Sequence, residues 1–433
     1  MKHYDLIVAG GGFSGVMAAC AAGRDGLSVL LLEKSGALGG AACINYVLPF
    51  MNFMYTNKKN GERRPLSKGL FQEFLKRMEA YGALDGDVCV TFNEEYLKVV
   101  MDDMTDAYGV DVLFHSTLIG AETEDTEKGS PEDPGKILKS VRFLNVNGIM
   151  EATADRFIDA TGDGTLFQMA GCGYHVGRET DGKTQPMTLC FRMGNVDMAR
   201  FNREDRAKVN AIWKEKLAAG ELLNPREDIL TFSHMTPDVL HLNSTRVLGD
   251  PTDPEVRSKA EKTARKEMVE LYEFLKKYAP SCKDATILSS SYEIGVRESR
   301  MVDGLYQINT ADILECRKFE DAMTAGNYDI DIHSPDGSGT THYWIPDGDF
   351  YTIPYRACVP KDISNLLVAG RCISSTHEAQ AAYRIMPIVA CIGEGAGIMA
   401  AFAKQNGLKN YEVTAADVKQ CMDARDLVEK MDI

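Results

Sequence analysis

The residues with the clearest chemical meaning are six near the N-terminus, Gly10-Gly11-Gly12-Phe13-Ser14-Gly15. They follow a short apolar run, Tyr4 to Ala9, and open an alanine-rich stretch with helical character. In this pattern Gly10 permits a tight turn, Gly12 lets the main chain approach a ligand, and Gly15 lets a helix pack closely on a strand. Amide groups and the dipole at the start of such a helix attract phosphate. The spacing therefore predicts a site for the diphosphate of a dinucleotide.

An acidic residue, Glu33, closes the next apolar run, Ser28 to Leu32. A carboxylate at the end of the second strand of such a unit can bind the ribose hydroxyls of an adenosine. Phe13 and Ser14 in the turn, and Lys34 beside Glu33, complete the predicted adenosine-diphosphate site.

Three further features favour FAD over a nicotinamide dinucleotide. Gly39-Gly40, followed by Ala41 and Cys43, comes soon after the acidic residue, where a flavin chain must pass close to the backbone. Ala160-Thr161-Gly162-Asp163-Gly164 ends a buried strand, and a third apolar strand from Leu366 ends in Gly370-Arg371. FAD is long and needs contacts from several distant strand ends, so this order of motifs predicts FAD.

The glycines at 171–173 and at 393, 395 and 397 have no strand before them, so they do not form a second dinucleotide site. We expect Gly393, Gly395 and Gly397 to serve close helix packing. A dedicated NAD(P)H domain is therefore not predicted, and the electron donor or acceptor stays unknown.

With these motifs the chain resembles the flavoprotein superfamily built on the glutathione reductase-type FAD fold. More narrowly it resembles the FAD-dependent oxidoreductase family, which is related to the flavin module of heterodisulfide reductases. The narrower resemblance rests on these segments: Phe92 to Lys98, Gln185 to Thr188, Gly295 to Arg300, Ile353 to Arg356, Asn365 to Ser374 and Arg384 to Pro387. The iron–sulfur cysteines of the heterodisulfide relatives are missing here, so that electron route is not supported.

The resemblance also implies that the helix beginning at Pro387 points its N-terminus at the pyrimidine end of the flavin ring. Arg384, just before it, could stabilise charge on reduced flavin, bind a substrate carboxylate, or lie on the surface. Ile388 and Leu118 join the predicted cofactor contacts. Cys43 could be redox-active or a covalent flavin attachment point, although a small buried residue is the simpler interpretation.

For the proton that accompanies hydride transfer, His377 is the first candidate, with Tyr383 close by in sequence. Arg297 could bind an anionic substrate, or it and Arg300 could pair internally with Glu298. Thr188 is a possible pocket residue. Three other histidines are weaker candidates: His175, His333 and His342.

Composition excludes several classes of function. A net charge of −15 argues against nucleic-acid binding, including modification of tRNA. The 11 cysteines include no C-x-x-C pair, which argues against a disulfide framework or a metal site and fits a reducing cytoplasm. No signal peptide or unbroken apolar stretch long enough to span a membrane is evident. Oligomeric state is left open.

The elements that must position these residues predict an α/β protein. We expect a three-layer Rossmann-like FAD-binding domain, with a parallel sheet and a β-meander, from residues 1–190 and 350–433. A hairpin with a type I′ turn at Asn147-Gly148 belongs to the meander, and a polar loop is expected over 122–136. Residues 191–349 should form a mixed α+β substrate domain with helices over 203–220 and 254–278, and 46–92 could contribute to it.

The predicted function is FAD-mediated hydride transfer between flavin N5 and a small polar or anionic organic substrate. The alternative is a flavin-binding electron-transfer subunit without a small-molecule site, which would show an exposed flavin and an apolar docking face. A closed pocket lined by histidine and arginine would argue against that alternative.

Overall fold

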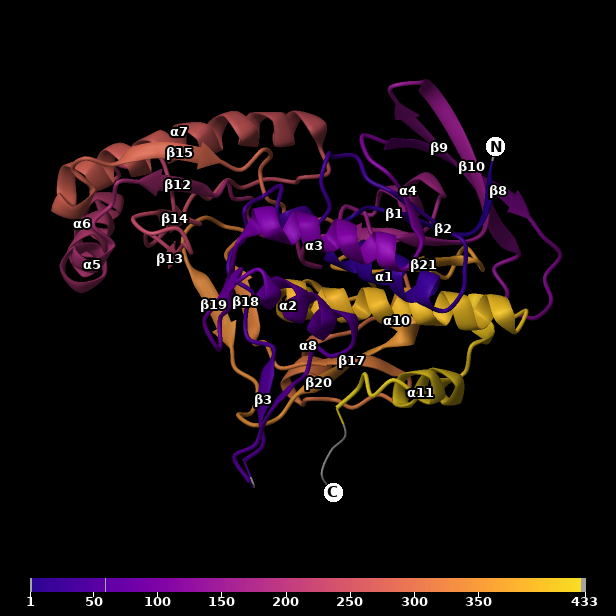
Figure 1. Ribbon diagram of the computed structural model, residues 1–433. Coiled ribbons are helices and arrows are strands. Elements are labelled where there is room, and N and C mark those ends of the chain that lie inside the picture. Colours follow the sequence, from indigo (N-terminus) through magenta and orange to yellow (C-terminus); the bar gives the residue numbers. More distant parts are fainter. Residues whose placement is uncertain (1, 59, 430–433) are drawn as a thin grey trace.

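The structure is a computed structural model that describes residues 2–58 and 60–429. A seven-stranded sheet lies at its centre, in the order β7-β2-β1-β10-β9-β8, with β21 also paired to β10 (Figure 1). Five of the strands run parallel: β7 (Val110–Leu113), β2 (Val29–Leu32), β1 (His3–Ala9), β10 (Gly148–Asp159) and β21 (Leu366–Val368). The meander adds β9 (Lys136–Asn145) and β8 (Thr117–Asp125) in antiparallel pairing. The predicted α/β class with a parallel sheet and a meander is confirmed.

Two helices of small residues pack side by side at the sheet, α1 (Phe13–Arg24) and α10 (Met386–Gln405) (Figure 1). A Cβ atom on Gly393 would lie 2.0 Å from the Ser14 carbonyl oxygen, and one on Gly397 would lie 2.2 Å from that of Ala18. These contacts confirm that the glycines serve helix packing. One described helix, α10, is long and apolar enough to cross a membrane, but 94% of its most apolar window is buried in the fold, as expected for a core helix.

The meander differs in two places from its sequence prediction. Among the turn residues only Gly148 has a positive φ, of 91°, whereas a type I′ turn needs positive φ at both central positions. Val146 and Asn147 therefore form the turn, and Gly148 opens β10. The strands also extend further into the polar segment than expected, so the loop covers only 126–135. Cross-strand pairing outweighs the low strand propensity of Glu122 to Asp125.

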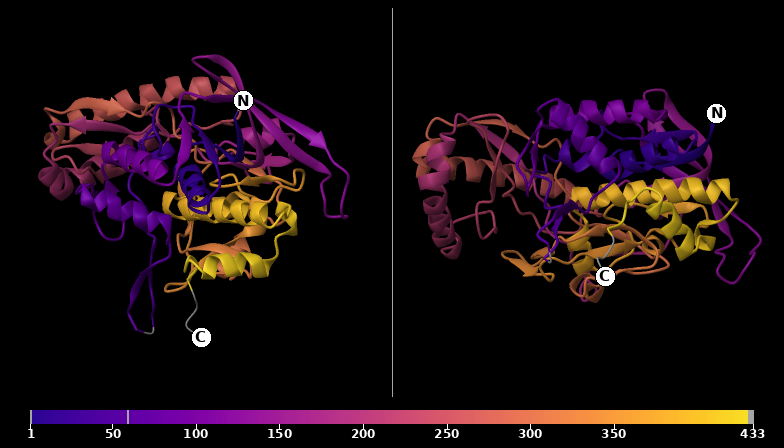
Figure 2. Two further views of the ribbon diagram at one scale, coloured as in Figure 1. Left: turned by 45° about the vertical axis from the view of Figure 1, so that its right-hand side comes forward. Right: turned by 60° about the horizontal axis from the view of Figure 1, so that its bottom comes forward.

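A smaller antiparallel sheet, in the order β13-β14-β12-β15, lies at the end of the molecule away from the meander (Figures 1 and 2). Its strands are β13 (Thr231–Ser233), β14 (Leu240–Leu242), β12 (Phe191–Gly194) and β15 (Thr286–Ser290). One face packs against α6 (Arg206–Ala218) and α7 (Pro254–Tyr278), with Trp213 and Phe274 in edge-to-face contact. The helix expected from residue 203 begins earlier, because α5 (Met198–Arg200) and a π-helical turn over Phe201–Asp205 run into α6.

The remaining elements surround these two sheets. The helices are α2 (Leu70–Ala80), α3 (Glu94–Ala107), α4 (Thr165–Met169), α8 (Thr310–Leu314), α9 (His377–Tyr383) and α11 (Ala415–Asp423). The strand pairs are β3 (Met54–Thr56) with β4 (Arg63–Pro65), β5 (Leu84–Asp85) with β6 (Thr91–Phe92), β11 (Tyr174–Val176) with β16 (Arg300–Val302), β17 (Ala322–Gly326) with β20 (Tyr351–Pro354), and β18 (Ile330–His333) with β19 (Thr340–Tyr343). Met323 and Ile330, which the sequence placed in the substrate domain, pack in the main core where β17 contacts α10. The predicted domain boundaries stay a prediction.

Candidate active site

The turn between β1 and α1 has the geometry that the glycine pattern predicts. Gly10 has a φ of 99°, and a Cβ there would lie 2.5 Å from the Ala160 carbonyl oxygen. A Cβ on Gly15 would lie 1.8 Å from the Gly10 carbonyl oxygen, so both positions require glycine. Around Gly12, in contrast, a Cβ would meet only the Cα of Gly40, at 3.9 Å. Gly12 and Gly40 thus leave an open cradle at the helix start.

The start of α1 offers unused hydrogen-bond donors to this cradle. No side chain caps the helix, and the buried Ser14 hydroxyl has no partner among the described residues. Positive φ values at Gly39 and Gly40, of 104° and 50°, turn the neighbouring chain around the same space. A helix N-terminus with free amides favours an anion.

Glu33 lies at the rim of this cradle and is 7% exposed. Its Oε2 accepts a hydrogen bond from the Gly11 amide at 2.6 Å, and its Oε1 accepts from the Ser35 amide at 2.7 Å. The carboxylate therefore fixes the glycine turn to the end of β2, and its remaining acceptor capacity faces the cavity.

An open cavity joins these parts. Most of the cofactor residues predicted from sequence line it: Gly10, Gly12, Phe13, Ser14, Glu33, Lys34, Gly39, Gly40, Ala41, Ala160, Thr161, Gly162, Asp163, Gly370 and Arg371. Besides the Ser14 hydroxyl, the Nε atoms of Arg371 and Arg384 are buried without a partner in the described part of the chain, and both side chains line the cavity. The free donors at the glycine cradle itself, the first amides of α1 and the Ser14 hydroxyl, fit the anionic diphosphate of FAD.

Other cofactor residues proposed from sequence do not line the cavity. Gly15 packs under the turn, and Pro387 and Ile388 lie inside the first turn of α10, although Met386 and Val389 of the same turn do line it. Leu118 lies in β8 against the main core.

The Cys43 side chain turns away from the cavity. Its Sγ lies 3.8 Å from the Glu94 carbonyl oxygen, and its side chain packs beneath Gly39. Burial raises the pKa of the thiol to about 12, so it is neither a ready nucleophile nor a flavin attachment point in this geometry. The simple buried-residue interpretation of Cys43 agrees with the structure.

Sequence reasoning missed several residues that line the same cavity: Ile44, Asn45, Arg257, Glu293, Ile294, Val296, Met386 and Val389. Arg257 belongs to α7 and the 293–296 segment follows β15, so both come from the part of the chain that was assigned to the substrate side. The available signal was the Gly295 to Arg300 segment, which carries part of the family resemblance and contains the candidate Arg297.

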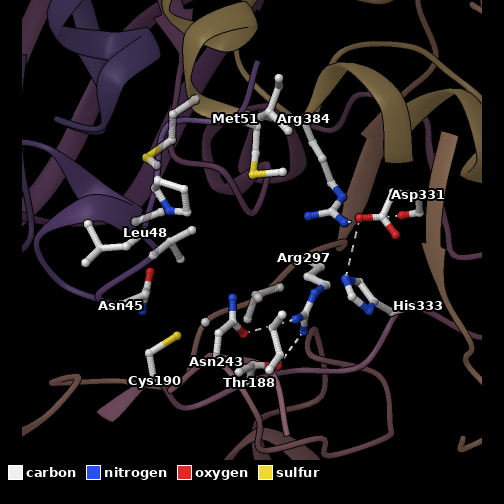
Figure 3. Close-up of a pocket in the computed structure, with 18 of the residues that line it drawn as sticks. Asn45, Leu48, Met51, Thr188, Cys190, Asn243, Arg297, Asp331, His333 and Arg384 are labelled. Carbon is white, nitrogen blue, oxygen red and sulfur yellow. Dashed lines mark hydrogen bonds and ion pairs between the residues drawn. The ribbon is translucent and has the colours of Figure 1, made fainter. Parts of the chain in front are cut away.

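A second cavity adjoins the first and shares lining residues with it: Ala41, Asn45, Val296, Arg371, Arg384 and Met386. One wall is apolar and includes Leu48, Pro49 and Met51. The opposite wall is polar and includes Arg297 and His333 (Figure 3). We call this space the substrate cavity and the first one the cofactor cavity.

Arg297 reaches into the substrate cavity without a carboxylate partner among the described residues. Its Nη1 donates to the Pro186 carbonyl oxygen at 2.7 Å and to Thr188 Oγ1 at 2.5 Å, and its Nη2 donates to Asn243 Oδ1 at 3.4 Å. Burial, together with Arg384 and other nearby arginines, lowers the pKa of Arg297 to about 9. The expected internal pair with Glu298 does not form, because Glu298 binds His377 instead.

Arg384 enters the cavity from the end of α9, opposite Arg297 (Figure 3). Its Nη2 donates to Gln185 Oε1 at 3.3 Å and approaches the Asp331 carbonyl oxygen at 3.5 Å. Both of these acceptors are uncharged. Two guanidinium groups therefore face one cavity, and the contacts described for Arg297 and Arg384 include no ion pair.

His333 lies beside this pair on β18, and its ring orientation is set by Arg246. Arg246 Nη2 lies 3.2 Å from His333 Nδ1, and a guanidinium can only donate. Nδ1 must then accept, so the ring proton of the neutral imidazole is on Nε2, which lies 3.9 Å from Asp331 Oδ2. Burial and the nearby arginines hold the pKa of His333 well below its usual range. His333 is a neutral hydrogen-bond donor here.

The two proton-transfer candidates favoured from sequence do not reach either cavity. His377 is 3% exposed, and its Nδ1 lies 2.8 Å from both Glu298 oxygens in an internal pair. Tyr383 is fully buried, with its hydroxyl 2.7 Å from Ser375 Oγ. Both hold α9 in place. Of the earlier candidates, Arg297, Arg384, His333 and Thr188 line the substrate cavity, and His175 and His342 do not.

No group of three or more histidine, cysteine, aspartate or glutamate side chains in residues 2–58 and 60–429 could hold a metal ion. The candidate site consists of the cofactor cavity and the arginine-lined substrate cavity, which share part of their lining.

Comparisons with known proteins show to which family the chain belongs. The sequence profile of the family described as FAD dependent oxidoreductase matches residues 5–422. No curated protein gives a significant match.

Three solved structures are distantly similar to this chain. A geranylgeranyl bacteriochlorophyll reductase-like protein from Thermoplasma acidophilum has 13% identity and a TM-score of 0.47, with 98% of this chain and 83% of that chain covered. A flavoprotein/dehydrogenase from Cytophaga hutchinsonii has 14% identity and a TM-score of 0.45, over 98% and 84% of the two chains. A p-nitrophenol 4-monooxygenase from Pseudomonas putida has 11% identity and a TM-score of 0.45, over 98% and 86%. Likenesses this distant carry no argument about substrate. The profile match over nearly the whole sequence shows that the chain belongs to the FAD-dependent oxidoreductase family, and it is an enzyme of that class that binds FAD.

Proposed function

We propose that this enzyme transfers a hydride between FAD and a small anionic organic compound, with a carboxylate as the charged group. FAD, when bound, supplies hydride transfer at N5 of its ring. The observation that carries the proposal is the pair Arg297 and Arg384, which face one cavity and make no ion pair among the contacts described for them. Half-buried cations without a counter-ion are costly, and a bound anion would offset that cost.

The position of the pair supports binding next to the flavin. Arg384 lines both cavities, while Arg297 lines only the substrate cavity. A guanidinium presents a planar fork that matches a carboxylate in two parallel hydrogen bonds. The pair would therefore orient the substrate as well as attract it. The apolar wall of Leu48, Pro49 and Met51 suits the carbon skeleton.

Two further side chains of the polar wall have roles in this proposal. His333 presents its Nε2 proton and can donate to a hydroxyl or carbonyl oxygen of the substrate. Asp331 lines the same wall, and one of its carboxylate oxygens, Oδ1, is buried without a hydrogen-bond partner among the described residues. It is the group we assign to accept or return the proton that accompanies hydride transfer.

The rival function is an electron-transfer subunit without a small-molecule site. A second cavity lined by buried arginine and histidine disfavours it, because a docking face for a redox partner needs neither feature. We also propose, from the motif order, wider kinship with the glutathione reductase-type superfamily and with heterodisulfide reductases. The eleven free cysteines support a reducing, cytoplasmic setting.

The test is an anaerobic screen of the purified holoprotein with small organic acids and their neutral amides. We expect at least one acid to bleach the oxidised flavin, or to reoxidise flavin that has been reduced by light, while its amide does not. Arg297→Gln should raise KM for that acid roughly tenfold or more, because charged hydrogen bonds are worth about 1.5–3 kcal/mol. The matched control is Arg265→Gln, at an exposed arginine of α7. If reduced partner proteins exchange electrons with the flavin and no small molecule does, the rival is correct.

A further inference from the structure

Five charged side chains of alternating sign line the cofactor cavity: Lys34, Glu293, Arg257, Asp163 and Arg371. Lys34 Nζ lies 2.9 Å from Glu293 Oε1, and Glu293 Oε2 lies 3.6 Å from Arg257 Nη2. Arg257 Nη1 lies 2.8 Å from Asp163 Oδ2, and Asp163 Oδ1 lies 2.7 Å from Arg371 Nη2. We call these residues the charge chain. Lys34 follows Glu33, at the end of the cavity assigned to adenosine, and Arg371 also lines the substrate cavity, so the charge chain runs along the rim between the two.

The charge chain joins parts of the protein that are far apart in sequence. Lys34 follows β2, Asp163 follows β10 and Arg371 follows β21, so three members come from ends of the central parallel sheet. Arg257 comes from the first turn of α7, and apolar residues further along this helix pack against the smaller antiparallel sheet. The same helix also holds the chain next to Glu293, because Glu261 Oε1 accepts a hydrogen bond from the Ile294 amide at 2.7 Å.

The exposure of these side chains places them at the rim of the cavity. The side chains of Asp163, Glu293 and Arg257 are 21%, 25% and 28% exposed, and that of Lys34 is 53% exposed. Burial would raise the pKa of Asp163, yet Arg371 and Arg257 lower it to about 2, so the carboxylate stays ionised between them. Three cations and two anions leave the chain with a surplus positive charge facing a site for a diphosphate.

We propose that Arg257 is a cofactor-retaining residue, which closes the rim of the cofactor cavity over bound FAD through its ion pairs with Asp163 and Glu293. FAD then leaves only when this link between α7 and the central sheet opens. A helix of the predicted substrate domain, α7, thereby helps to hold the cofactor. It does not depend on which substrate the enzyme uses.

Two physical consequences follow. Partly exposed ion pairs weaken as salt screens them, so the release of FAD should accelerate with ionic strength. Removal of the Arg257 charge should accelerate release at low salt and should also remove much of that salt dependence. Lysine in its place keeps the charge but cannot span Asp163 and Glu293 with two nitrogens, so it should restore retention only in part.

The experiment measures the release rate of FAD from the holoprotein, followed by the rise in flavin fluorescence after dilution into excess adenosine diphosphate as a non-fluorescent competitor. Arg257→Gln should release FAD about five- to tenfold faster at low salt, with Arg257→Lys in between. The matched control is Arg203→Gln, where the arginine is 73% exposed and pairs with Glu204 away from the cofactor cavity. It should stay within about twofold of the unchanged protein.

Far-UV circular dichroism and thermal unfolding of each apoprotein check that the variants fold. Glu293→Gln provides a second, independent break in the charge chain and should also accelerate release. The proposal is overturned if folded Arg257→Gln releases FAD at the unchanged rate. It is equally overturned if release from the unchanged protein does not respond to potassium chloride.

Discussion

At the scale of single residues, the cofactor site depends on Glu33 in two ways. Its carboxylate accepts amide hydrogens from Gly11 and Ser35, and the same group faces the cavity. A glutamine keeps the shape but supplies one acceptor oxygen in place of two and loses the charge. We expect Glu33→Gln to weaken FAD binding roughly 10- to 100-fold, because charged hydrogen bonds are worth about 1.5–3 kcal/mol. Fluorescence titration of apoprotein with FAD measures this, and unchanged affinity would refute the assignment.

His333 offers a prediction about protonation. Since Arg246 donates to Nδ1 and burial lowers the pKa of the ring, His333 should be neutral with its proton on Nε2 at pH 7. Long-range proton–nitrogen NMR of protein labelled at histidine nitrogens reads the tautomer directly, and His333→Asn identifies the signals. In Arg246→Met the ring should lose this fixed tautomer. An imidazolium pattern at pH 7 in the unchanged protein would contradict the site geometry.

Residue roles were the hardest to predict from sequence. His377 and Tyr383 follow the third FAD motif closely, yet both face inward and stabilise α9. His333, which the sequence ranked low, is far from every motif and reaches the cavity because β18 runs beside α9. Sequence distance from a motif gives no account of long-range packing, whereas the cofactor glycines were predictable because backbone geometry demands them.

At the scale of elements, the contact between α1 and α10 links the cofactor turn to the C-terminal helix. An added methyl group at Gly393 would press on the Ser14 carbonyl, 2.0 Å away. We expect Gly393→Ala to destabilise the protein by about 1–3 kcal/mol, as overpacked cores do, and to weaken FAD binding because Ser14 shifts. Gly129→Ala, where a Cβ would meet ordinary contacts only, is the control. Denaturant unfolding and FAD titration measure both effects, and full stability in Gly393→Ala would mean that the helices are not so close.

The long helix α7 carries a second element-scale prediction. Burial raises the pKa of Glu267 to about 8, against an ordinary value of 4.5. Between these values the folded protein holds a proton that the unfolded chain has lost, so this contribution to stability decreases as pH rises, by up to about 1.4 kcal/mol per pH unit. Glu267→Gln should therefore unfold at a higher temperature than the unchanged protein at pH 8, with the difference shrinking toward pH 5. Glu273→Gln, at an exposed site on the same helix, should show no such trend.

Elements with strong local signals were predicted well. The helix over 254–278 was confirmed, because Asp253 caps it and Pro254 opens it. The hairpin was predicted but its turn type was not, because Gly148 pairs with Asn145 in the ladder and the two turn residues are Val146 and Asn147, neither of which has a positive φ. Strand ends in the polar segment depend on pairing partners, which local sequence does not reveal.

At the scale of the whole molecule, the cofactor and substrate cavities form one continuous site. The segment 293–297 borders both, with Glu293 in the charge chain and Arg297 in the substrate cavity. The α/β sheet and the FAD motifs were predictable from the sequence because they repeat a local strand–turn–helix pattern. The position of 293–297 beside the cofactor cavity was not predictable from the sequence, because it depends on how the smaller sheet and α7 dock.

The central claim is that an anion binds between Arg297 and Arg384 beside the flavin. The most direct measurement is an anaerobic titration of four holoproteins with one active acid and its amide: the unchanged protein, Arg297→Gln, Arg384→Gln and the control Arg265→Gln. We predict that the acid alone changes the flavin redox state in the unchanged protein and the control, and that both site variants need far more of it while their bound FAD remains. Equal response to acid and amide, or an undiminished response in both site variants, would contradict the account.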